Sequence, residues 1–183
     1  MDKSNTITLY HGSIYDFDKI DITHGKPYKD FGRGFYTSRV EQHASSLAVR
    51  NKEIEYERNA LRGKKADNKA WLYVYELDLI AVKELKTKEF TAPDREWMKF
   101  VVLNRISRTT QHDYDIVIGA TANDNTRASI QVVLSAAGGN ILTDKALDAL
   151  IALVEPENLP SQVYFGTQRA ADFLKLKSRR IIR

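Results

Sequence analysis

The sequence predicts a fold of the α+β, or mixed α/β, class, and two observations support this prediction. Short segments in which apolar and polar residues alternate predict strands, and longer segments with apolar residues every three or four positions predict helices. The two kinds of segment do not follow each other in the regular order of a doubly wound parallel sheet. With 183 residues, 43% of them hydrophobic, the chain is expected to form a single domain over residues 1–183.

The first strand is predicted at residues 6–12, where the side chains alternate in polarity and His11 lies at the strand end. Residues 13–34 then contain three glycines and one proline among polar residues, which predicts a long irregular connection with one short turn of helix. A long loop inside a compact domain is more often functional than average. We therefore expect part of the functional site in this connection.

The next segment predicts a short strand at residues 35–38 that leads into a helix. Ser38 and Glu41 have the spacing of a capping box, which places the helix start at Ser38. Residues 51–69 are dominated by charge, which predicts a frayed helix end and an exposed, mobile connection. The apolar face expected for the helix consists of Val40, Ala44, Leu47 and Ala48.

The clearest strand signal lies at residues 71–79, where large apolar residues occupy every second position. We therefore expect this strand at the centre of the sheet. A second strand is expected at residues 82–90. The dipeptide Pro93-Asp94 then predicts the start of a helix that continues to Asn104.

The last third of the chain predicts strands and helices in turn. Residues 114–119 predict a buried strand, and the helix after it is expected to end at Gly138-Gly139. A second helix is expected at residues 143–154. The final elements are a strand at 162–165, a short helix near 170–174 and a basic strand at 179–183.

The composition excludes several kinds of site. Because the chain has no cysteine, it has no disulfide, thiolate nucleophile or cysteine-bound metal, and its four histidines lack metal-ligand spacing. No apolar run reaches the ~20 residues of a membrane span, and the polar start of the chain lacks the apolar core of a signal peptide, so we expect a soluble, cytoplasmic protein without a membrane partner. The net charge of +4 suits nucleic acid, a nucleotide or an acidic protein alike.

Three short motifs are candidates for chemistry: Leu9-Tyr10-His11-Gly12-Ser13, Asp30-Phe31-Gly32-Arg33-Gly34-Phe35-Tyr36-Thr37-Ser38 and Ser161-Gln162-Val163-Tyr164-Phe165. Each has an ordinary structural explanation, because a strand-end histidine is more often structural than catalytic and Gly-x-Gly more often forms a turn than a ligand site. Taken together, the three motifs also have a functional explanation. A strand-end histidine, an aromatic residue after a glycine-rich loop and a polar residue at the start of a late strand can converge on one pocket.

The motifs resemble the ADP-ribosyltransferase superfamily in its His-Tyr-Glu branch, which includes diphtheria-type toxins and poly(ADP-ribose) polymerases. They are more similar still to a small bacterial family described as a domain of unknown function, marked by Tyr-His-Gly-Ser and Asp-Phe-Gly-x-Gly-Phe-Tyr. The resemblance extends from Leu9 to about Leu176. It implies a split mixed β-sheet core with flanking helices, NAD as the substrate and no metal.

The resemblance also implies roles for individual residues, with His11, Tyr36 and Gln162 as the catalytic ones. His11 would bond a ribose hydroxyl of NAD, Gly12 would offer its backbone to the nicotinamide amide, and Tyr36 would stack on the nicotinamide ring. The other NAD-binding residues implied are Ser13, Arg33 and Gly34, and Arg33 or Arg39 is suited to the pyrophosphate.

Position 162 departs from the His-Tyr-Glu pattern, because a glutamate of that branch is replaced by Gln162. Glutamine still bonds a ribose hydroxyl, but it has no charge and cannot act as a base. Glutamine is typical of the small bacterial family at this place, so we interpret it as a variant of the site. The alternative acids are Glu155, Glu157, Asp115 and Asp124. Asn104-Arg105 and residues 122–124 also resemble recurring parts of that family, and the sequence assigns them no role.

The resemblance favours a bacterial toxin or effector that transfers ADP-ribose to a macromolecule, in a toxin–antitoxin setting with a small cognate antitoxin. A protein acceptor is favoured over nucleic acid, because the charge of +4 is modest. One alternative is an NAD glycohydrolase with water as the acceptor. A second is a non-catalytic NAD-binding or protein-interaction module, which glutamine at position 162 favours.

Overall fold

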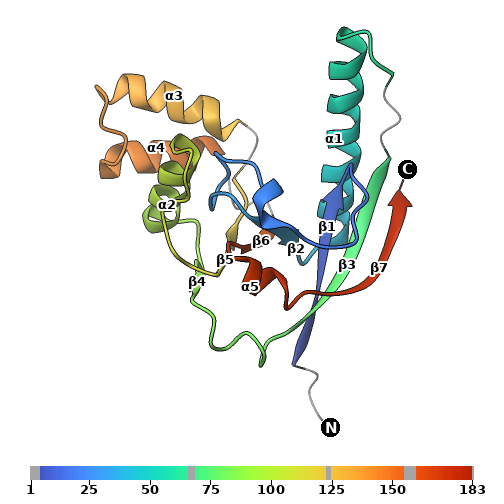
Figure 1. Cartoon of the computed structure of the whole chain (residues 1–183). Helices are drawn as coiled ribbons and strands as arrows, with labels where there is room; N and C mark the ends of the chain where they lie inside the picture. Colours follow the sequence, from blue (N-terminus) through green and yellow to red (C-terminus); the bar gives the residue numbers. More distant parts are fainter. Residues whose placement is uncertain (1–4, 66–68, 123–124, 155–159, 183) are drawn as a thin grey trace.

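The structure, a computed structural model, describes residues 5–65, 69–122, 125–154 and 160–182 (Figure 1). In these ranges seven strands form one sheet: β1 (Thr6–Ser13), β2 (Phe35–Ser38), β3 (Ala70–Asp78), β4 (Thr87–Glu89), β5 (Ile116–Ala120), β6 (Ser161–Phe165) and β7 (Lys175–Ile182). The helices are α1 (Glu41–Leu61), α2 (Arg95–Ile106), α3 (Thr126–Ala136), α4 (Asp144–Val154) and α5 (Gln168–Ala171), with a 3-10 turn at Ile22–His24.

The strand order is β4-β5-β6-β2-β1-β3-β7. β4 and β5 run parallel, and the other neighbours run antiparallel, so the sheet is mixed. The predicted α+β class is therefore confirmed. The short turn of helix expected in the long connection before β2 is present as well.

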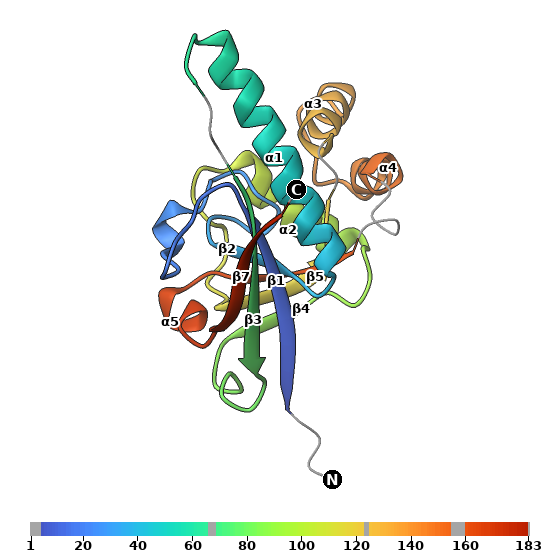
Figure 2. The ribbon, with the colours of Figure 1, turned by 90° about the vertical axis from the view of Figure 1, so that its right-hand side faces the viewer.

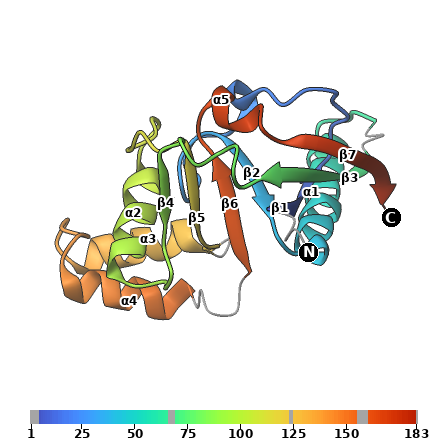
Figure 3. The same cartoon turned by 90° about the horizontal axis from the view of Figure 1, so that it is seen from below.

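The sheet consists of two halves that meet at β1 and β2. β1 pairs with β3 along its whole length, and β2 pairs with β6 over all four of its residues. Between β1 and β2, within the described residues, the pairing is a single one, Tyr10 opposite Ser38. Toward Ser13 and Phe35 the two strands separate, and we call this opening the split. Figure 3 shows the strands of the two halves running in clearly different directions.

The helices cover the two faces of the sheet unequally. α1 packs on β1 and β3, and α2, α3 and α4 lie over the other half on the same face, whereas α5 lies on the opposite face (Figure 2). Two apolar cores result. The core under α2–α4 includes Trp97, Leu150 and Tyr164, and the core beside α5 includes Leu9, Phe35 and Val163.

Helix α1 differs from the prediction at both ends. It begins at Glu41, and the Ser38 hydroxyl accepts a hydrogen bond from the Val40 N–H at 3.0 Å instead of capping the first turn. The predicted capping box is therefore wrong. The helix also continues to Leu61 through the segment expected to fray, where Glu55 accepts hydrogen bonds from Arg58 and Asn59 at helical spacing.

The predicted apolar face of α1 is only partly correct. Ala44 and Ala48 are buried, but Val40 and Leu47 are 45% and 40% exposed. The helix approaches β1 very closely, since a Cβ atom on Gly12 would lie 2.0 Å from the Ala44 carbonyl oxygen. Small residues allow this approach, and the larger apolar residues stay at the flank of the contact.

Two strand predictions need correction. The strand expected at residues 71–79 forms as β3, but it is not central, because it lies between β1 and the edge strand β7. The strand expected at residues 82–90 is confined to β4, and a turn occupies most of the segment before it. Val82 and Leu85 are buried from this turn, so their apolar pattern reflects burial and not an extended backbone.

The remaining elements agree with the sequence to within a few residues. Asp94 caps α2 by accepting a hydrogen bond from the Trp97 N–H at 3.0 Å, and Gly138 and Gly139, with φ of 61° and 93°, follow α3. The terminal strand begins at Lys175 instead of Arg179. No helix in the described ranges is both long and apolar enough to cross a membrane.

Candidate functional site

His11 lies where β1 and β2 separate, and its side chain bridges the two strands. Its Nδ1 is 2.7 Å from the carbonyl oxygen of Tyr36. A backbone carbonyl only accepts hydrogen bonds, so the imidazole carries a proton on Nδ1 and donates it to this oxygen. The histidine side chain thus bonds a carbonyl that a neighbouring strand would bond in an unbroken sheet.

The surroundings of His11 keep it neutral. Burial lowers the pKa of the imidazole from 6.5 to about 4, although the hydrogen bond to Tyr36 acts in the opposite direction. The ring centroid lies 4.2 Å from that of Phe35 and 5.9 Å from that of Phe17. At neutral pH Nε2 therefore carries a lone pair, and because the residue stays partly exposed it can accept a hydrogen bond from a ligand hydroxyl.

Tyr36 is fixed through its hydroxyl group. The hydroxyl donates to the Gly32 carbonyl at 2.7 Å and accepts from the Phe31 N–H at 3.1 Å. The ring centroid lies 5.1 Å from that of Tyr164, and burial raises the pKa of the hydroxyl well above its ordinary value. The residue as a whole is partly exposed, and its aromatic ring is held in one orientation.

The side chains of His11 and Tyr36 project from opposite faces of the sheet. His11 stands on Phe35, on the α5 side, whereas Tyr36 packs against the core under α2–α4. Gln162 pairs with Ser38, two residues along β2 from Tyr36, and so shares the face of Tyr36. The structure therefore brings Tyr36 and Gln162 to one face and connects them to His11 through the Tyr36 backbone at the split.

Gln162 lies next to a buried carboxylate. Its Nε2 donates hydrogen bonds to Asp30 Oδ2 at 2.7 Å and to the Ala120 carbonyl oxygen at 3.2 Å. Both side chains are almost completely enclosed, with exposed fractions of 8% for Gln162 and 4% for Asp30. Gln162 is therefore held in one orientation by a buried polar network.

Asp30 is the centre of that network. Its Oδ1 accepts hydrogen bonds from Nε and Nη2 of Arg105 at 2.7 and 2.6 Å, and its Oδ2 also accepts one from the Ala122 N–H at 3.0 Å. A buried carboxylate needs such donors to offset the hydration that it loses. The network joins the loop before β2, the end of α2, the segment after β5 and the start of β6.

The glycines of the site have packing reasons of their own. Gly32 has φ of +90°, and a Cβ there would lie 2.5 Å from the Thr110 hydroxyl oxygen. A Cβ on Gly34 would lie 2.4 Å from the Phe165 carbonyl oxygen. A Cβ on Gly12 would collide with the backbone of α1 at Ala44. The fold itself therefore needs these three glycines, independently of any ligand.

The other residues expected to bind NAD lie around the split. The Ser13 hydroxyl accepts a hydrogen bond from the Tyr15 N–H at 2.9 Å. Arg33 is exposed, and its backbone N–H donates to the Thr110 hydroxyl at 3.0 Å, while Arg39 is exposed as well. Both arginines are thus accessible to an anion from solvent.

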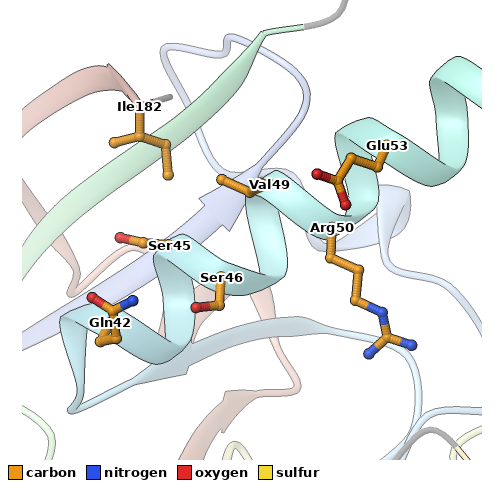
Figure 4. Close-up of a pocket in the computed structure, with 7 residues that line it drawn as sticks. All are labelled: Gln42, Ser45, Ser46, Val49, Arg50, Glu53 and Ile182. Atoms are coloured by element: carbon orange, nitrogen blue, oxygen red, sulfur yellow. The ribbon is translucent and has the colours of Figure 1, made fainter.

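A hollow of about 430 Å³ lies elsewhere, along the outer flank of α1 (Figure 4). Its lining consists of Gln42, Ser45, Ser46, Val49, Arg50, Glu53 and Ile182. None of the residues predicted for the site is among them. Across the described ranges, no group of three or more His, Asp or Glu side chains is placed to hold a metal ion.

Comparison with protein families finds one match that covers nearly the whole chain. A family described as a protein of unknown function, DUF3990, matches residues 7–176. The chain belongs to the DUF3990 family. No curated protein and no solved structure matches it. The match confirms the expected relation to a domain of unknown function, and it spans all three motifs.

In this DUF3990 chain the sequence alone misses Asp30 and Arg105 as functional candidates. An aspartate before a glycine-rich loop is ordinarily a turn residue, and an arginine in the last turn of a helix ordinarily interacts with the helix terminus. Both residues stand in segments singled out from the sequence, Asp30 at the start of the second motif and Arg105 after Asn104. That position was the only signal, and it does not indicate that the two side chains meet.

Among the acids considered in place of Gln162, Asp115 is the one in the described part of the DUF3990 chain, and the structure does not bring it to Gln162. Asp115 accepts hydrogen bonds from the Thr167 hydroxyl at 2.6 Å and the Lys86 N–H at 2.9 Å. Gln162 pairs with Gly119, which lies about 13 Å along β5 from Asp115 at ~3.3 Å per residue. Glu155, Glu157 and Asp124 lie outside the described residues.

Proposed function

We propose that this DUF3990 chain is an NAD-dependent ADP-ribosyltransferase that releases nicotinamide and transfers ADP-ribose to a macromolecule. The observation that carries the proposal is the 2.7 Å bond from His11 Nδ1 to the Tyr36 carbonyl, which joins the first two motifs at the split. A ligand that touches both side chains binds at the split, since they project from opposite faces. NAD is elongated and carries two ribose groups and a flat nicotinamide, so it has separate groups for the two side chains.

Each residue has a separate task in this proposal. His11 accepts a hydrogen bond from a ribose hydroxyl through Nε2, Gln162 bonds a ribose hydroxyl as well, and Tyr36 stacks on the nicotinamide ring. The bond between nicotinamide and ribose C1′ breaks, and its electron pair leaves on the nicotinamide nitrogen. A nucleophile of the acceptor bonds to C1′ and loses its proton to water. Holding NAD in this orientation and stabilising the positive charge at the ribose are what the site contributes.

A protein is the favoured acceptor, because the net charge of +4 is small for nonspecific binding of nucleic acid. An enzyme that modifies proteins with a common metabolite suits the role of a bacterial toxin or effector. Such an enzyme requires control inside the cell that makes it, which is consistent with a small cognate antitoxin.

A second candidate rests on the state of the two side chains beside the proposed ribose position. Gln162 has no basic group, and the Asp30 carboxylate is occupied by Arg105, Ala122 and Gln162. Gln162 therefore cannot take the proton of an acceptor. This favours, as the alternative, a module that binds NAD without cleaving it, and an NAD glycohydrolase with water as the acceptor is the other alternative.

Incubation with labelled NAD and a bacterial lysate tests the proposal, with nicotinamide release and label on protein or nucleic acid followed together. The wild type is compared with His11→Ala and with His24→Ala, a matched control in which the lost side chain is 86% exposed. We expect label on protein with the wild type and His24→Ala but not with His11→Ala. Free ADP-ribose without macromolecular label would establish the glycohydrolase, and tight NAD binding without nicotinamide release would establish the binding module.

A further inference from the structure

The buried network fixes which end of the Gln162 amide meets a ligand. The amide has two hydrogens on Nε2, and both are directed at oxygens that only accept, Asp30 Oδ2 and the Ala120 carbonyl. Turning the amide around would place its own oxygen against these two oxygens. The orientation is therefore set, and none of the described residues donates a hydrogen bond to Oε1.

We propose that Asp30, held in place by Arg105, is a positioning residue that makes position 162 a pure hydrogen-bond acceptor. This inference rests on the proposed function, in which the group facing position 162 is a ribose hydroxyl of NAD. Asp30 accepts one hydrogen of the amide and the Ala120 carbonyl accepts the other, so the amide cannot turn around and Oε1 is the atom left to bond a ligand. Gln162 then supplies the acceptor oxygen of a carboxylate without the charge of one.

The same network explains why a glutamine suits this position better than an acid. A carboxylate at position 162 would lie against the Asp30 carboxylate and the Ala120 carbonyl, with no hydrogen to offer to either. Arg105 donates to Asp30 Oδ1, on the other side of the carboxyl group, and cannot separate the two charges. Like charges in an enclosed site repel strongly because little water screens them. Glutamine is thus the residue that matches Asp30.

A double-mutant cycle tests the positioning without any ligand. Asp30→Asn places one amide against another, and Gln162→Glu places two carboxylates together, so each single variant is expected to lower the melting temperature by about 5 °C. The double variant restores a donor opposite an acceptor and is expected to recover more than half of the summed loss. Asp172→Asn with Gln168→Glu is the matched control, since these side chains share a 2.8 Å hydrogen bond at an exposed position. Their effects should add, and additive effects at positions 30 and 162 would overturn the proposal.

Binding of two ligands then tests the acceptor role. Calorimetry compares NAD with its analogue that lacks the 2′-hydroxyl of the nicotinamide ribose. The wild type is expected to bind NAD at least tenfold more tightly than the analogue. Asp30→Asn is expected to lose this preference because its Gln162 amide turns around, and the double variant is expected to regain it. A merely structural role would weaken both ligands alike, and an unchanged preference in Asp30→Asn would refute the inference. If the wild type binds neither ligand, the proposed function and the ribose assignment fail together, whereas the cycle still reports the amide orientation.

Discussion

Replacing Gly12 with alanine tests how closely α1 lies on β1. The added methyl carbon would lie 2.0 Å from the Ala44 carbonyl oxygen and 3.0 Å from the Ala48 Cβ. Non-bonded heavy atoms stay about 3.5 Å apart, so α1 has to move outward by roughly 1.5 Å. The oxygen belongs to the backbone and cannot rotate away. Ala44 and Ala48 are the buried residues of α1, so this movement removes most of its packing, and we expect the free energy of unfolding to fall by about 3 kcal/mol.

Urea unfolding at pH 7, followed by circular dichroism, measures this loss. Gly119→Ala is the control, because its Cβ would meet its nearest neighbour, Phe31 Cζ, at 3.2 Å and the loss should stay below about 1 kcal/mol. Equal stability of the two variants would show that α1 does not rest on Gly12. A Gly12→Ala variant of full stability that has lost NAD binding would instead assign the glycine to the ligand.

Variants at three positions, His11, Tyr36 and Arg105, test the site. The pKa of His11 is about 4 in the folded protein and 6.5 ordinarily, so the unfolded chain takes up a proton first and the free energy of unfolding falls as the pH is lowered from 6.5 to 4. In urea titrations at several pH values, His11→Gln should flatten this pH dependence. An unchanged pH dependence would contradict the burial of the imidazole. Tyr36→Phe loses two hydrogen bonds and about 2 kcal/mol of stability but keeps its aromatic ring. Tyr36→Ala should lower the rate of nicotinamide release at least tenfold, which corresponds to a rise of about 1.4 kcal/mol in the activation barrier. Equal rates in the two variants would exclude stacking. Arg105→Met leaves the Asp30 carboxylate without its ion-pair partner and should lower stability by about 3–5 kcal/mol, while Arg95→Met, which breaks exposed ion pairs, should change it little; similar losses in thermal unfolding would contradict the role of burial.

The sequence predicts individual elements well where a local signal is strong. The aspartate cap of α2 and the glycines after α3 act within a few residues, and both are found in the structure. The prediction fails where apolar residues enter the core from a turn, as Val82 and Leu85 do, since alternation then reflects burial alone. It also fails to place β3, because the position of a strand in a sheet depends on partners far away in the chain.

The site shows the same limit. The motifs single out His11, Tyr36 and Gln162 as candidates, but they do not indicate which residues connect these three side chains. Asp30 is 75 residues from Arg105 and 132 residues from Gln162 along the chain, and their meeting follows from the order of the strands. Local patterns indicate that a residue is buried, whereas the partner that satisfies a buried charge is decided by the fold.

The order of the strands also governs how the chain can reach its folded state. β1, β3 and β7 form one half of the sheet and β2, β4, β5 and β6 the other, so the chain passes between the halves after β1, β2, β3 and β6. Neither half is a continuous segment. During synthesis the outer edge of β3 has no partner until Lys175–Ile182 has emerged, and pairing across such distances is slow because long loops must close first. Folding of this chain therefore finishes at its last strand.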